Sequence, residues 1–122
     1  MSTLNELAEQ ISAINHASGW FDIQRPFGDD IALIHSEVSE AYEEFRNGHQ
    51  PDERYYSGAG LTSADPDGVP FPKPEGVPSE LADIIVRVLD TAHRYGIDMD
   101  AVMAEKLAHN ATRGYRHGGK VI

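Results

Sequence analysis

Two pairs of carboxylates are spaced so that each pair lies on one face of a helix. The pairs are Glu37-x-x-Glu40 and Glu80-x-x-Asp83. Residues three apart are neighbours on a helix surface, and at about 100° per residue both pairs lie at the same edge of an apolar stripe. If the two helices pack by those stripes, the four carboxylates approach one another. They then repel unless a cation lies among them. Oxygen ligands without Cys or His suit Mg²⁺, Mn²⁺ or Ca²⁺, so the pattern indicates phosphate chemistry.

The same spacing also arises where nothing suggests a metal. Glu6 and Glu9 form a third pair beside an apolar stripe, in a chain that holds twenty acids. A solvated helix edge therefore stays open as an alternative. The metal site is favoured because two matching pairs are followed by a helix with cationic side chains.

That last helix carries polar and cationic groups on the side that its apolar residues predict to face inward. Lys106, Asn110 and Arg113 fall within about 60° of one another on the helical wheel. Burying an ammonium and a guanidinium is costly without anionic partners. A triphosphate beside a carboxylate cluster would supply those partners. The alternative is a solvated helix end, where Lys and Arg favour the C-terminal dipole.

Four helices are expected to position these residues. Apolar residues recur at helical spacing over about 3–17, 29–46, 79–95 and 98–113. Helix caps and stops are expected at Asp29 or Asp30, Ser79 and Asp98, and at Gly19, Asn47-Gly48, Gly96 and Gly114. No strand is expected. The sequence predicts a single all-α domain over 1–122 with a four-helix bundle-like protomer.

Residues 47–79 differ in composition from the helical segments. They hold six of the seven prolines and five of the eleven glycines, so no regular element is expected there. A loop this long in a small domain is usually functional or mobile, and a tolerated surface insertion is the alternative. We expect the loop to pack over a partner subunit or the rim of a nucleotide site.

Composition limits the class of protein. A length of 122 residues fits one domain, and the absence of cysteine excludes disulfides and thiolate metal sites. A formal charge of −10 disfavours nucleic-acid binding. No apolar run is long enough to span a membrane, and no signal peptide is visible at the N-terminus. A cytoplasmic protein without a membrane or nucleic-acid partner is expected.

Taken together, the motifs resemble the MazG-like, all-α nucleoside triphosphate pyrophosphohydrolase family. The resemblance rests on the two acidic pairs, on Lys106-x-x-x-Asn110-x-x-Arg113, and on the run Tyr115-Arg116-His117-Gly118-Gly119-Lys120. It covers the chain from about Trp20 to Lys120 apart from the proline-rich segment. It implies cleavage of nucleoside triphosphates to a monophosphate and pyrophosphate, with Mg²⁺ and with Mn²⁺ as a possible substitute. It also implies a homo-dimer or homo-tetramer. One departure is the 40 positions between Glu40 and Glu80, where compact members have fewer.

The resemblance also implies roles for residues. The metal ligands would be Glu37, Glu40, Glu80 and Asp83. Alternatively, one of Glu37 and Glu40 would act as the general base in place of a ligand. Lys106 and Arg113 would hold the phosphates, and Asn110 a phosphate, a water or the sugar. Trp20, the only tryptophan, would stack on the base. His16 lies nearby at the end of the first helix. A core role for Trp20 and an ordinary helical role for His16 stay open.

Two other classes compete with this enzyme. A di-iron carboxylate bundle needs Glu-x-x-His pairs, and no Glu here is followed by His three residues on. A non-enzymatic acidic interaction protein that mimics a nucleic acid is compatible with the charge. It would not need cations on an inward helix face.

Overall fold

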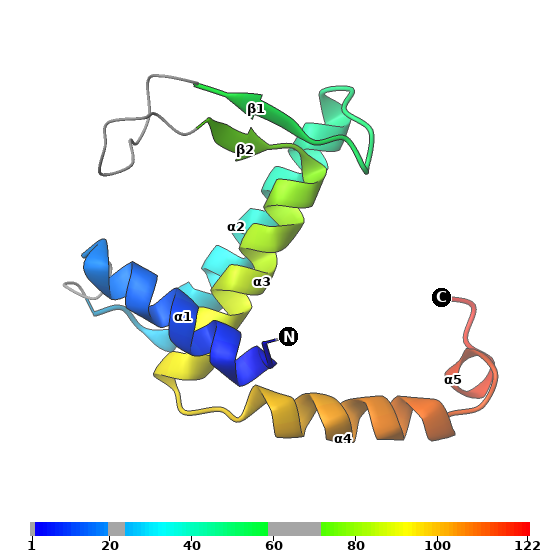
Figure 1. The fold of residues 1–122 in the computed structure, drawn as a ribbon. Coiled ribbons are helices and arrows are strands. Elements are labelled where there is room, and N and C mark those ends of the chain that lie inside the picture. Colours follow the sequence, from blue (N-terminus) through cyan, green and yellow to red (C-terminus); the bar gives the residue numbers. More distant parts are fainter. Residues whose placement is uncertain (1, 20–23, 59–71) are drawn as a thin grey trace. The chain divides into compact units, whose positions relative to one another are not determined.

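The computed structural model describes residues 2–19, 24–58 and 72–122. These residues form five helices and one small antiparallel sheet (Figure 1). The elements in chain order are α1 (Leu4–Ala17), α2 (Phe27–Arg46), β1 (Tyr55–Ser57), β2 (Lys73–Glu75), α3 (Val77–Arg94), α4 (Met99–Thr112) and α5 (Arg116–Gly119). Because the described residues are mostly helical and the sheet has only two short strands, the predicted all-α class is confirmed. None of the described helices is long and apolar enough to cross a membrane.

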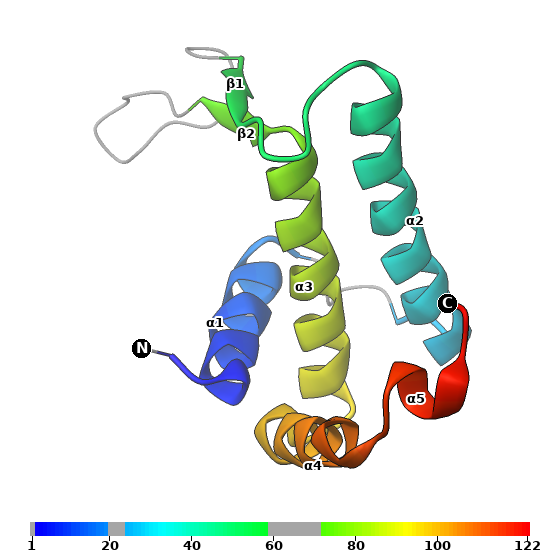
Figure 2. The same cartoon turned by 90° about the vertical axis from the view of Figure 1, so that its right-hand side faces the viewer.

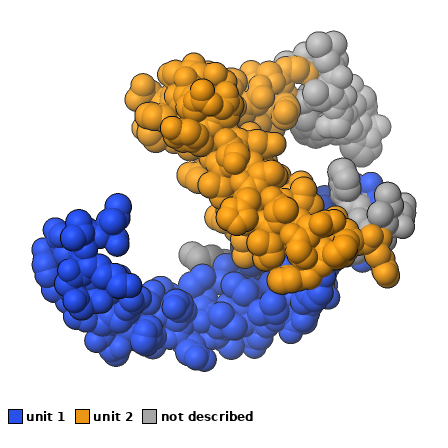
Figure 3. Space-filling model, turned by 180° about the vertical axis from the view of Figure 1, so that it is seen from behind, with its two compact units in different colours: residues 1–22, 89–122 blue, residues 23–88 orange. Residues whose placement is uncertain are grey.

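The chain divides into two compact units (Figure 3). One unit consists of Met1–Asp22 and Leu89–Ile122, and the other of Ile23–Val88. Helix α3 therefore contributes its first twelve residues, 77–88, to the second unit and its last six, 89–94, to the first.

In the first unit, α1 and α4 cap each other's N-termini. Oδ1 of Asp100 accepts a hydrogen bond from the backbone N–H of Leu4 at 2.9 Å, and Oδ2 accepts from Asn5 at 3.3 Å. In return, Oδ1 of Asn5 accepts from the backbone N–H of Met99 at 2.9 Å. Asp98 also caps α4, as predicted, through its side chain and the N–H of Ala101. Since the first N–H groups of a helix lack intrahelical partners, these bonds fix where both helices begin.

The beginnings of α2 and α3 differ from the prediction. Helix α2 begins at Phe27 after Pro26, with no side-chain cap, so a cap by Asp29 or Asp30 is wrong. The reason is that Asp30 is buried inside the first turn, where its Oδ1 lies 2.6 Å from Nε of Arg25. Helix α3 begins at Val77, two residues earlier than expected, with Pro78 in its first turn. That position suits proline, because a first-turn N–H has no intrahelical partner.

The expectation that 47–79 holds no regular element is also wrong. A hairpin forms there, with Tyr55 opposite Glu75, Tyr56 opposite Pro74 and Ser57 opposite Lys73. Tyrosine favours strands, and Pro74 is tolerated because each strand of a two-stranded sheet is an edge. Gly76 joins the hairpin to α3 with a φ of +103°, and a Cβ there would overlap the carbonyl oxygen of Glu53. Only glycine fits this close approach. The expected packing of the loop falls mostly on 59–71, outside the described residues.

In the second unit, α2 and α3 lie side by side and run antiparallel (Figure 1, Figure 2). Their packing differs from the predicted apolar seam. Glu37 and Ala41 of α2 are buried, whereas Val38, Tyr42 and Phe45 are exposed. Leu81 and Ile85 of α3 are exposed as well. Glu37 thus lies at the contact between the helices, and a large part of each apolar stripe remains uncovered in the single chain.

Helix α4 is exposed along nearly its whole length. Every residue from Ala101 onward is exposed, including Val102, Met103 and Leu107. The prediction that Lys106, Asn110 and Arg113 face a core is therefore wrong for the single chain. After α4, Arg116 and His117 have positive φ, so α5 is a tight turn more than a regular helix.

Candidate metal centre

Three carboxylates from α2 and α3 meet in the second unit. Glu37 and Glu40 come from α2 and Glu80 from α3, and one carboxylate oxygen of each lies within 4.8 Å of the others. Glu37 is buried, Glu80 is half-buried and Glu40 is exposed. The i, i+3 spacing places Glu37 and Glu40 on one face of α2, and the antiparallel start of α3 brings Glu80 to that face. We call these three residues the acidic triad.

The acidic triad is electrostatically unfavourable without a cation. Burial, the charge of Glu40 and a hydrogen bond with Glu40 raise the pKa of Glu80 to about 7, with smaller effects from Asp83 and Glu37. Oε2 of Glu80 is buried and accepts no hydrogen bond within the described part of the chain. A buried carboxylate oxygen without a partner carries a substantial desolvation penalty. The triad therefore has a vacant acceptor oxygen where a cation would remove the penalty.

Asp83, the fourth predicted ligand, lies near this cluster without belonging to the triad. Its side chain is on α3 one turn after Glu80, and the residue is exposed. Partial desolvation of its carboxyl group and the charge of Glu37 raise the pKa of Asp83, while Arg87 and Lys73 act in the opposite direction. The structure thus brings three of the four predicted acids together and leaves Asp83 at the edge.

Arg87 is a member of this site that the sequence analysis missed. Its Nε donates a hydrogen bond to Oε1 of Glu37 at 3.0 Å. The Glu37 side chain is 10% exposed and the Arg87 side chain 37% exposed. A signal was present, since Arg87 follows Asp83 by four residues and Glu80 by seven on the same helix. Both spacings place it on the acidic face of α3.

The residues of the site fit a hard divalent cation. Carboxylate oxygens are the donors that Mg²⁺ and Mn²⁺ prefer, and the buried Oε2 of Glu80 is available to coordinate. Glu37, Glu40 and Glu80 would hold the ion directly. A cation at this place would also favour the ionised form of Glu80.

The other predicted site residues belong to the first unit or lie outside the described residues. His16 is an exposed residue near the end of α1. Lys106 and Asn110 lie on α4, and Arg113 is its C-cap residue. All three are exposed. Their proposed contact with the phosphates stays a prediction. Trp20 lies outside the described residues.

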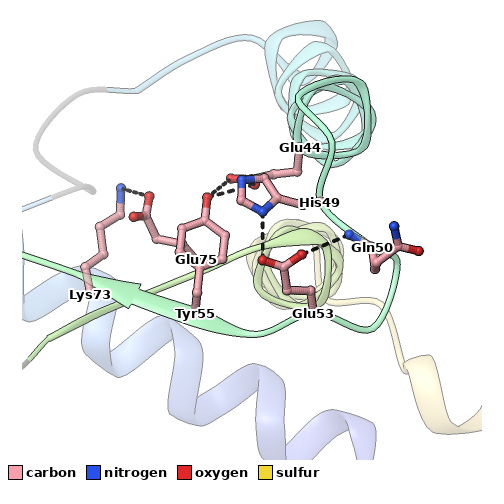
Figure 4. A network of polar contacts seen from close by, with 7 residues as sticks. All are labelled: Glu44, His49, Gln50, Glu53, Tyr55, Lys73 and Glu75. Carbon is pink, nitrogen blue, oxygen red and sulfur yellow. Dashed lines mark hydrogen bonds and ion pairs between the residues drawn. The ribbon is translucent and has the colours of Figure 1, made fainter.

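A polar network joins Glu44, near the end of α2, to the residues that follow the helix and to the hairpin (Figure 4). The hydroxyl of Tyr55 donates to Glu44, at 2.9 Å from Oε2. Nδ1 of His49 lies 2.9 Å from Oε2 of Glu53, and the His49 ring stacks on Tyr55 at 4.5 Å between centroids. The hydrogen bond with Glu53 is the main cause of a raised pKa at His49, and the same bond lowers the pKa of Glu53. The network attaches the hairpin to the end of α2.

A surface hollow of about 390 Å³ lies beside the hairpin and the start of α3. Its lining includes Tyr55 and Tyr56 from β1 and Ser79 and Ala82 from α3. Ser79 directly precedes Glu80 of the acidic triad. The hollow therefore offers aromatic and polar surface close in sequence to the carboxylates.

Neither protein-family models, nor curated proteins, nor solved structures give a match to this chain. The resemblance to the MazG-like family therefore stays a prediction from the motifs, and the site is argued from its own geometry.

Proposed function

We propose that this protein hydrolyses nucleoside or deoxynucleoside triphosphates to the monophosphate and pyrophosphate, by attack of water at the α phosphorus. The observation that carries the proposal is the acidic triad, in which three carboxylate oxygens lie within 4.8 Å of one another across two helices. Crowded carboxylates are costly to fold. Such a cluster is expected where a cation and a polyphosphate use it.

The roles of the acids follow from their surroundings. Glu37, Glu40 and Glu80 would hold Mg²⁺, with Asp83 at the edge of the coordination sphere. Bound Mg²⁺ would supply charge neutralisation on the phosphate oxygens. Glu37 is held by Arg87 in the buried part of the site, whereas Glu40 is exposed. With one oxygen of Glu40 counted as a metal ligand, its other oxygen is therefore the better candidate to accept a proton from the attacking water.

The remaining substrate contacts are proposals from the motifs and from the hollow. Lys106 and Arg113 would bind the phosphates, with Asn110 beside them, and Trp20 with His16 would contact the base. The hollow beside Tyr56 and Ser79 is a second place for the sugar or base. Aromatic rings at its edge favour stacking with a nucleobase.

Self-association is a further part of the proposal. Tyr42 is 63% exposed, Phe45 55% and Ile85 56%, which is unusual for large apolar side chains on helices of a folded unit. A homo-dimer or homo-tetramer would cover them. The predicted oligomer and the exposed apolar stripes are thus consistent with each other.

A pyrophosphate-release assay tests the function. The protein is mixed with Mg²⁺ and a panel of ribo- and deoxyribonucleoside triphosphates, and Glu40→Gln is assayed in parallel. We expect pyrophosphate from at least one triphosphate and its loss in the variant. Glu43→Gln is the matched control, because Glu43 lies on the same helix in an exposed ion pair with Arg46. No pyrophosphate from any triphosphate would instead favour an acidic interaction protein.

A further inference from the structure

Arg87 balances the negative charge of Glu37, the most buried residue of the acidic triad. Nε of Arg87 lies 3.0 Å from Oε1 of Glu37, and Glu37 retains only 8% of its exposure. An ionised carboxylate at this depth needs a counter-charge. Among the described residues, Arg87 is the cation that forms an ion pair with Glu37.

The ion pair uses only part of the guanidinium. Arginine carries five N–H donors in a planar fork, and the bond to Glu37 uses the one on Nε. The side chain is 37% exposed, so part of it remains accessible to solvent. The remaining donors have the geometry that binds phosphate oxygens in pairs.

A bound divalent cation would change the role of this arginine. The cation would neutralise Glu37 together with Glu40 and Glu80, and Glu37 would no longer depend on Arg87. The guanidinium would then lie beside a cation site with its fork free for a second anion. A polyphosphate bound to that cation is the anion that the site would bring there.

We propose that Arg87 is a substrate-binding residue that pairs with Glu37 in the free protein and with a phosphate group when metal and triphosphate are bound. This inference rests on the proposed function, and it adds a phosphate-binding cation from the same unit as the triad. It assigns to Arg87 a role that the motifs assign only to Lys106 and Arg113.

The proposal predicts opposite effects on two ligands. Arg87→Gln removes a positive charge beside the carboxylates, so the affinity for Mn²⁺ alone is unchanged or higher. The affinity for a triphosphate falls by roughly tenfold to a hundredfold, the usual effect of losing a hydrogen bond to a charged group. If Arg87 served only to hold Glu37 in place, Arg87→Gln would instead lower the affinity for Mn²⁺ alone.

The experiment uses the full chain and two probes that are independent of the base. Mn²⁺ binding is measured by electron paramagnetic resonance, and inorganic tripolyphosphate is then titrated by calorimetry at saturating Mn²⁺. Arg46→Gln is the matched control, because Arg46 is an exposed arginine paired with Glu43. We expect the control to behave as wild type and Arg87→Gln to lose tripolyphosphate affinity selectively.

Three results would overturn the inference. Tripolyphosphate binding equal to wild type in Arg87→Gln would remove the phosphate role, and a tenfold loss of Mn²⁺ affinity would indicate a structural role. In both cases the proposed function survives. If wild type binds no Mn²⁺, the proposed function fails together with this inference.

Arg87→Lys keeps the test decisive if Arg87→Gln does not fold. Lysine retains the charge beside Glu37 but lacks the planar fork. We expect Mn²⁺ affinity within about twofold of wild type and tripolyphosphate affinity several-fold lower. Wild-type tripolyphosphate affinity in this variant would overturn the inference.

Discussion

Replacing Glu80 by glutamine is expected to stabilise the metal-free protein at alkaline pH. The pKa of Glu80 is raised from 4.5 to about 7, mainly by burial and by Glu40. The folded state therefore holds the proton more tightly than the unfolded state. The contribution of protonated Glu80 to the free energy of unfolding is fully present below about pH 4.5 and is lost as the pH rises through about 7. Above pH 7 the folded protein must carry an unfavourable charge, which glutamine removes.

The magnitude follows from the same pKa values. One pKa unit corresponds to about 1.4 kcal/mol. The rise in the pKa of Glu80 from 4.5 to about 7 therefore sets an upper limit of roughly 3 kcal/mol on the cost of ionising Glu80 in the folded protein. Solvent screening at a half-buried site lowers this value. We expect Glu80→Gln to raise the free energy of unfolding by about 1–2 kcal/mol at pH 8 in EDTA, and by much less near pH 5.

Urea denaturation in EDTA at both pH values measures this effect, with Glu43→Gln as the control. Adding Mg²⁺ at pH 8 should stabilise wild type and should stabilise Glu80→Gln less, because the variant has lost a ligand. A variant that is no more stable than wild type at pH 8, or equally stabilised at both pH values, would refute the reasoning about the acidic triad.

Three further predictions concern other parts of the chain. Asp100→Ala should lower the free energy of unfolding by about 1–2 kcal/mol in urea, because the N–H groups of α1 lose their cap; an unchanged midpoint would contradict the capping. The raised pKa of His49 and the lowered pKa of Glu53 predict that their contact is strongest between about pH 4.5 and 6.5 and weakens on both sides. Amide hydrogen exchange in the hairpin, corrected for intrinsic rates, should show the greatest protection within this pH range in wild type and no pH dependence of protection in His49→Gln. The same dependence on pH in both proteins would show that this contact does not hold the hairpin. Light scattering at micromolar concentration should show at least a dimer, and Tyr42→Glu should shift it towards the monomer, whereas a monomeric wild type would contradict the proposed association.

The elements with local signals were predictable from sequence. Asp98 precedes an apolar periodic segment and caps α4, as predicted, and Thr3 caps α1 in the same way. A side-chain cap joins residues close in sequence, so it leaves a local signal, but the same signal misled at Asp29 and Asp30, because Asp30 is buried beside Arg25. The mutual capping of α1 and α4 was not predictable. It joins Asn5 to Met99 across 94 residues, and no local pattern encodes that distance.

The hairpin and the helix contact show where local patterns mislead. Proline and glycine density argued against strands, but Tyr55 and Tyr56 pair across the segment because edge strands tolerate Pro74. Apolar periodicity predicted that the stripe of α2 would be buried, but Val38, Tyr42 and Phe45 are exposed, and Glu37 at the edge of the stripe is buried. Burial of that carboxylate depends on Arg87 from another helix, which only the tertiary arrangement supplies. The spacing of Arg87 from Asp83 and Glu80 carried this signal, but spacing alone does not assign the partner.

The proposed hydrolysis is tested by ³¹P nuclear magnetic resonance of the reaction in H₂¹⁸O with Mg²⁺ and a mixture of nucleoside triphosphates. Attack of water at the α phosphorus places ¹⁸O in the monophosphate and leaves the pyrophosphate unlabelled. We predict an isotope-shifted monophosphate signal together with unshifted pyrophosphate, both absent in Glu40→Gln. Unchanged triphosphates, or ¹⁸O in inorganic phosphate accompanied by nucleoside diphosphate, would contradict the proposed pyrophosphohydrolase.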